Sequence, residues 1–117
     1  MDKEKLKQAA LQWMDDWNGR KLENIMGHYA EDVEFYSPTV TRRWNKAEGK
    51  LIGKDLLEQH FRKGIAEVPA MQFEFHSILY GIDGLILFYK RETGSLAADL
   101  VSFNEAGKVR EVRSYYE

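Results

Sequence analysis

Asp99 is the residue whose type and position most favour chemistry in this 117-residue chain. It lies within residues 95–103, a run that alternates as a β-strand does. Apart from Asp99 both faces of this strand are apolar, with Leu96, Ala98 and Leu100 on one and Ala97, Val101 and Phe103 on the other. A carboxylate covered on both sides loses its hydration and must be paired, hydrogen-bonded or protonated. The pattern predicts either a ligand pocket around Asp99 or a structural aspartate tied to a tryptophan N–H or a histidine.

His60 is the second titratable candidate. It falls in a helix predicted over residues 55–66, where Leu57, Phe61 and Ile65 recur every four residues. A His60–Asp99 pair would supply a base and a carboxylate that orients it, whereas a lone helical histidine is commonly a core or rim residue. The chain has three histidines without a close pair and no cysteine, so neither a metal site nor a cofactor is expected.

Composition limits the classes of partner. Hydrophobic residues make up 44% and charged residues 31% of the chain, which fits one globular domain. The formal net charge of −2 provides no basic field for nucleic acid. We find no apolar signal core and no run long enough to cross a bilayer, and with no cysteine present a cytoplasmic location is expected.

The elements that must position Asp99 follow from periodicity. Leu6, Ala10, Trp13 and Trp17 form a helical stripe over residues 3–17, and a shorter helix is predicted over 21–29. A short strand over 32–37 ends at Pro38. Residues 39–51 are predicted as a loop in which Arg42, Arg43 and Trp44 either clamp an anionic ligand or stay solvated.

The last third of the chain predicts an antiparallel meander. Strand-like runs at 71–80, 85–91, 95–103 and 108–116 are separated by short turns, and Gly107 suits the last of them. Helices followed by a meander indicate an α+β fold, with three N-terminal helices on the concave face of a curved, mainly antiparallel sheet.

This order of elements resembles the cone-shaped fold shared by nuclear transport factor 2, the ketosteroid isomerases and the SnoaL-like polyketide cyclases. The resemblance covers nearly the whole chain. The residues that carry it are Trp17-Asn18-Gly19 before Leu22-Glu23, the run from His28 to Val33, Ser37-Pro38, Gly49 and Gly53, and the run from Asn104 to Val109.

The resemblance to the ketosteroid isomerases implies that Asp99 donates a hydrogen bond to a substrate oxyanion, as a carboxylic acid kept neutral by apolar surroundings. The base of that family falls on Ser37 and its oxyanion tyrosine on Trp13. A serine without a basic partner does not shuttle a proton from carbon, so the steroid reaction itself is not implied. The comparison places around the cone interior Trp13, Trp17, Tyr29, Phe35, His60, Ile86, Phe88, Ala97, Asp99, Val112, Ser114 and Tyr116, with Ser37 beside them.

Two functions are therefore open. The first is a SnoaL-like protein that binds a small, apolar, carbonyl-bearing molecule and acts as a cofactor-free isomerase, cyclase or hydratase. The alternative is a non-catalytic ligand carrier or a dimeric interaction module like nuclear transport factor 2. The reverse face of the sheet is too apolar for water, so a homodimer is expected through its residues Leu85, Leu87, Tyr89, Leu96, Ala98 and Leu100.

Overall fold

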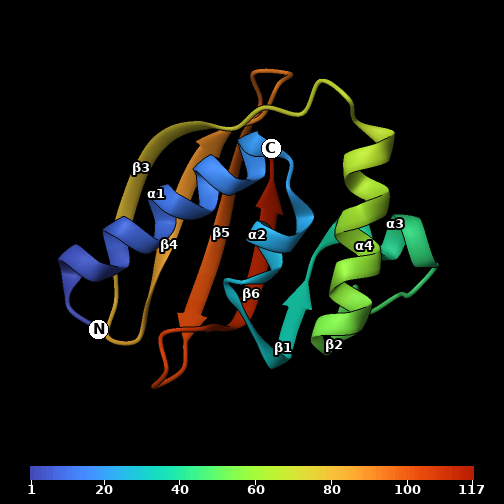
Figure 1. The fold of residues 1–117 in the computed structure, drawn as a ribbon. Helices are drawn as coiled ribbons and strands as arrows, with labels where there is room; N and C mark the ends of the chain where they lie inside the picture. Colours follow the sequence, from blue (N-terminus) through green and yellow to red (C-terminus); the bar gives the residue numbers. More distant parts are fainter.

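Four helices and six strands make up the computed structural model of the protein, which describes residues 1–117 (Figure 1). The helices are α1 (Lys3–Gly19), α2 (Leu22–Met26), α3 (Pro38–Trp44) and α4 (Lys54–Glu67). The strands are β1 (Tyr29–Tyr36), β2 (Lys50–Ile52), β3 (Glu74–Tyr80), β4 (Gly84–Lys90), β5 (Leu96–Phe103) and β6 (Val109–Tyr116). No helix is long and apolar enough to span a membrane.

All six strands form one sheet in the order β2-β1-β6-β5-β4-β3. Only β1 and β6 pair in parallel. Strand β6, the last of the meander from β3 to β6, lies beside β1 and runs in the same direction. Figure 1 shows α1, α2 and α4 on one side of this sheet, with the connection from α4 to β3 running across its top. The predicted α+β class and the mainly antiparallel sheet are confirmed.

Helix α1 confirms the stripe predicted from the sequence. Its buried residues are Leu6, Ala10, Met14 and Trp17, which recur at the spacing of one helical face. Asp2 caps the first turn, since its carboxylate accepts a hydrogen bond from the Lys5 N–H at 2.9 Å. The helix runs two residues further than predicted, to Gly19, and Arg20 caps it in a left-handed conformation.

The prediction of a loop over residues 39–51 was wrong, since this stretch contains α3 and β2. Ser37 caps α3 by accepting a hydrogen bond from the Thr39 N–H at 3.2 Å, and Pro38 suits the first turn because it has no N–H to satisfy. Strand β2 pairs antiparallel with β1. Both elements are too short to show a period, so the signal that the sequence analysis missed was the Ser37-Pro38 cap. The helix predicted over 21–29 likewise ends at Met26, and Tyr29 already belongs to β1.

The two faces of β4 were also assigned the wrong way round. Leu87 pairs with Asp99 of β5, so Leu85, Leu87 and Tyr89 lie on the same concave face as Asp99. Ile86 and Phe88 therefore lie on the convex face, beside Ala98 and Leu100 of β5. Residues 85–89 are all apolar or aromatic, so their alternation carried no information about which face is inside.

Candidate functional site

A cavity of about 170 Å³ lies between the concave face of the sheet and helices α1 and α4. Most of its lining residues are hydrophobic, and Asp99 is among the few polar ones. An apolar cavity of about 150 Å³ is large enough to hold benzene. The space here therefore suits a ligand of about the size of one six-membered ring.

Aromatic rings from three elements form one wall of this cavity. Trp13 of α1 stacks on Phe73 with centroids 5.9 Å apart, and Trp17 meets the edge of Phe61 of α4 at 4.8 Å. Phe35 of β1 contacts Phe61 at 5.4 Å with the rings perpendicular. Such offset and edge-on contacts between large rings restrict their rotation, so the wall is formed before a ligand arrives.

Asp99 lies on the sheet side of the cavity with only 4% of its surface exposed. The Tyr89 hydroxyl donates to its two carboxylate oxygens at 3.3 and 3.4 Å, and Ser114 lies opposite it on β6. No basic side chain forms an ion pair with it. Burial raises the pKa of Asp99 to about 6, although hydrogen bonds from Ser114 and Tyr89 pull that pKa down. Near neutral pH this carboxyl group is able both to donate and to accept a proton.

The tyrosine and tryptophan groups that line the cavity are neutral, whereas Arg42, Arg43, Arg91 and Glu92 also belong to its lining. Burial raises the pKa of Tyr89 and Tyr29, so both phenols keep their protons. The Trp13 indole N–H donates to the Tyr29 hydroxyl at 2.8 Å. The Trp17 N–H lies near enough to lower the Tyr29 pKa, but it makes no hydrogen bond of good geometry and is a buried donor without a partner.

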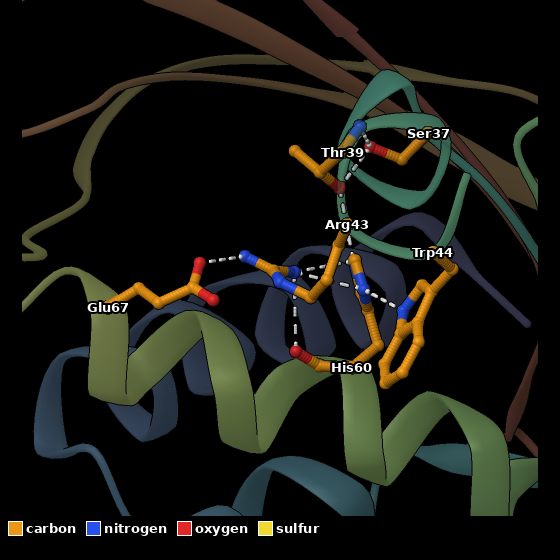
Figure 2. Close-up of polar contacts among 6 residues, drawn as sticks. All are labelled: Ser37, Thr39, Arg43, Trp44, His60 and Glu67. Atoms are coloured by element: carbon orange, nitrogen blue, oxygen red, sulfur yellow. Dashed lines mark hydrogen bonds and ion pairs between the residues drawn. The ribbon is translucent and has the colours of Figure 1, made fainter. Parts of the chain in front are cut away.

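His60 is nearly enclosed, with 3% of its surface exposed, and Figure 2 shows its ring among polar groups of α3. Trp44 Nε1 and Arg43 Nη1 both lie 3.0 Å from His60 Nδ1, and Thr39 Oγ1 lies 3.1 Å from Nε2. Burial, followed by the positive charge of Arg43, lowers the pKa of His60 to about 4. The imidazole is neutral at physiological pH, and no hydrogen bond joins it to Asp99.

Nine of the predicted site residues do line the cavity: Trp13, Trp17, Tyr29, Phe35, His60, Asp99, Val112, Ser114 and Tyr116. Ser37 does not line it, because its hydroxyl lies behind the wall at the cap of α3 and 3.5 Å from Tyr116 Oη. Phe88 points away from it, on the convex face.

Several lining residues were missed by the sequence analysis. Leu87 and Tyr89 follow from the corrected faces of β4, and Phe73 lies in the connection before β3, where no period marks it. Arg43 is neither a solvated loop residue nor free to clamp an anion with its whole guanidinium group. Its side chain is 11% exposed, and its Nη2 pairs with Glu67 at 2.9 Å (Figure 2).

The fold and cavity together define a protein of the nuclear transport factor 2-like class, in which helices close the concave side of a curved sheet. The family model described as "SnoaL-like domain" matches residues 10–112. The chain therefore belongs to the SnoaL-like domain family. A search of curated proteins finds no match.

Solved structures agree with this assignment. A SnoaL-like protein of unknown function from Burkholderia thailandensis is 27% identical, with a TM-score of 0.95 over 99% of this chain and 97% of that one. A candidate isomerase of the SnoaL-like family from Agrobacterium tumefaciens is 14% identical, with a TM-score of 0.77 over 97% of both chains. TerC, co-crystallised with polyporic acid, is 16% identical, with a TM-score of 0.77 over 97% of this chain and 92% of TerC.

Proposed function

We propose that this protein binds a mostly apolar, carbonyl-bearing molecule of about one ring in the cavity around Asp99. The observation that carries this proposal is the carboxyl group of Asp99, which is buried, forms no ion pair with a cation, and has its pKa raised to about 6. A protonated carboxyl group in apolar surroundings donates a strong hydrogen bond to a carbonyl oxygen, and the same group shuttles a proton once it ionises. The aromatic wall supplies apolar contact for the rest of the ligand.

We further propose that catalysis at this site is cofactor-free isomerisation, cyclisation or addition of water. Each of these reactions develops negative charge on a carbonyl-derived oxygen, which is where Asp99 would donate. The likeness to the Agrobacterium candidate isomerase and to TerC, which was crystallised with polyporic acid, supports small-molecule chemistry on this fold.

The alternative proposal is a non-catalytic ligand carrier or a dimeric interaction module. Ser37, at the position where the ketosteroid isomerases place their base, favours this alternative. The Ser37 hydroxyl is occupied by the cap of α3 and lies 2.7 Å from Thr39 Oγ1, and no hydrogen bond or ion pair links it to a basic side chain. A ligand that binds to Asp99 but is released unchanged would identify a carrier.

Two probes that differ in one atom test the binding proposal. Cyclohexanone carries a carbonyl oxygen, and methylenecyclohexane replaces that oxygen with CH₂ at nearly the same size. We expect the wild type to bind cyclohexanone about tenfold more tightly in NMR titrations at about pH 5, where Asp99 is protonated, and Asp99→Leu to lose most of that preference, because one hydrogen bond from a polarised donor is lost. Asp99→Asn retains a hydrogen-bond donor and should keep part of the preference for cyclohexanone. No discrimination by the folded wild type would refute the proposal, and an Asp99→Leu variant that merely unfolds would favour the structural role.

We also propose that the convex face of the sheet joins two copies of the chain. Phe88, Ala98 and Leu100 form its centre, and it exposes 58% of Leu79 and 56% of Tyr115. Apolar side chains grouped on an uncovered sheet favour an isologous dimer. We expect Ala98→Glu, which buries a charge at the centre of this face, to give a monomer by light scattering at micromolar concentration.

The same change in the turn between β5 and β6, Ala106→Glu, is the matched control and should leave the dimer intact, because Ala106 is exposed there. A wild-type protein that stays monomeric over the same concentrations would contradict the proposed interface.

A further inference from the structure

The hydrogen bonds around His60 determine which of its nitrogens carries the proton. Trp44 Nε1 lies 3.0 Å from Nδ1, and an indole N–H only donates. Arg43 Nη1 lies 3.0 Å from Nδ1 and 3.4 Å from Nε2, a position over the face of the ring and not along either lone pair, so the assignment rests on Trp44. Nδ1 must therefore present its lone pair, and the proton of the neutral ring resides on Nε2. With its lone pair bound by the Trp44 N–H and the cationic Arg43 against its ring, His60 is not free to act as a base.

This assignment sets the direction of the hydroxyl groups that follow. His60 Nε2–H donates to Thr39 Oγ1 at 3.1 Å, so the Thr39 proton is free to donate to Ser37 Oγ at 2.7 Å (Figure 2). Ser37 Oγ already accepts the Thr39 backbone N–H, and its own proton points to Tyr116 Oη at 3.5 Å. Each hydroxyl has one proton, so every link in the series points away from His60.

Tyr116 is the end of this series. Its oxygen accepts from Ser37, and burial raises its pKa although hydrogen bonds from Ser37 and Ser114 pull that pKa down, so the phenol keeps its proton. Tyr116 lines the cavity, and the guanidinium group of Arg91 lies over its ring at 4.6 Å. A cation against the ring and a donor to its oxygen both make the phenol proton a better hydrogen-bond donor.

The first residue of the series is held from both sides. Arg43 donates to the His60 backbone carbonyl at 3.4 Å and pairs with Glu67 at 2.9 Å, so its guanidinium group links two residues that are about two turns apart on α4. Trp44 lies beneath the ammonium group of Lys63 at 5.2 Å. The Trp44 donor and the Arg43 cation that contact the ring are therefore fixed relative to the helix that carries His60.

We propose that His60, Thr39 and Ser37 form a one-way hydrogen-bond relay, which orients the Tyr116 hydroxyl into the cavity as the second donor to the ligand oxygen beside Asp99. Tyr116 touches the ligand, whereas His60, Thr39 and Ser37 are positioning residues. The relay itself is a property of the free protein, and only the ligand contact of Tyr116 rests on the function proposed above.

The first test is the protonation of His60 in the free protein. Two-bond ¹H–¹⁵N correlation spectra, assigned with His60→Gln, should show a neutral ring protonated on Nε2 near neutral pH. Thr39→Val removes the acceptor and should shift the Nε2 signal, and Thr39→Ser should restore it. Thr41→Val is the matched control, because Thr41 lies on the same helix, exposed and outside the relay. A ring protonated on Nδ1, a cationic ring, or equal shifts in Thr39→Val and Thr41→Val would overturn the relay.

The second test asks whether the relay reaches the ligand. We expect Tyr116→Phe to reduce the preference for cyclohexanone over methylenecyclohexane about fivefold, as the loss of one hydrogen bond does. Thr39→Val should reduce it by a smaller factor, about twofold to threefold, because the 3.5 Å link to Tyr116 transmits only part of the effect.

The outcomes of the two tests separate the two proposals. A wild type that shows no preference between the probes refutes the carbonyl ligand, and the His60 spectra then decide the relay alone. A wild-type preference that Tyr116→Phe leaves unchanged overturns the role of Tyr116 as second donor while the proposed function stands.

Discussion

Replacing Asp99 with leucine is expected to change the free energy of unfolding in a pH-dependent way. The difference between the variant and the wild type should shift in favour of the variant by about 2 kcal/mol from about pH 4 to about pH 8. The reason is that folding raises the Asp99 pKa from 3.8 to about 6. The folded state therefore binds this proton more tightly than the unfolded state does. The resulting stability is fully present below the unfolded pKa and is lost as the pH rises through about 6. Leucine does not titrate, so the variant escapes this loss.

Urea unfolding over a series of pH values measures the difference between the two proteins. His60 acts in the opposite sense over part of this range, because its lowered pKa removes stability as the pH falls toward about 4. That contribution is common to wild type and variant and cancels in the difference. Val101→Ala, two residues along the same face of β5, is the control, and its cost should not vary with pH. Parallel pH curves for wild type and Asp99→Leu would contradict the raised pKa.

Phe61→Ala is expected to lower the free energy of unfolding by about 3–5 kcal/mol, the usual cost of removing a fully packed ring. Phe61 is 5% exposed and lies at the centre of the aromatic wall, against Trp17, Tyr29 and Phe35. Removing the ring extends the existing cavity of about 170 Å³, so the variant should accept larger ligands than the wild type does.

Urea unfolding with and without benzene tests both parts of this expectation. Benzene should stabilise Phe61→Ala more than wild type, because binding to the folded state alone raises its stability. Phe75→Ala is the matched control, since Phe75 is 44% exposed and its removal should cost less than about 1 kcal/mol. A loss for Phe61→Ala as small as that of the control would show that the wall is not packed as described.

The elements that could be predicted from the sequence are those with a long period or a marked turn. Helix α1 has a stripe over four turns, and β5 and β6 are joined by a turn in which Gly107 adopts a φ of 78°. Asp99 could be singled out because it is a lone charge in an apolar strand, a pattern that needs no knowledge of the tertiary structure.

The rest depended on information that a sequence pattern does not hold. Strand β4 is apolar on both faces, so only its pairing with β5 shows that Tyr89 and not Phe88 meets the cavity. The role of His60 depends on Arg43 and Trp44, which were predicted in a loop and in fact lie on α3, packed against α4. The volume of the cavity depends on how the rings interlock, which composition does not determine.

The measurement that tests the central claim most directly is a ¹³C NMR titration of the Asp99 carboxyl carbon, with and without cyclohexanone. A buried carboxyl group that donates to a carbonyl oxygen should titrate near its expected pKa of about 6, and the ligand should raise that value because it binds the protonated form. A midpoint near the ordinary value of 3.8, unmoved by the ligand, would contradict the account.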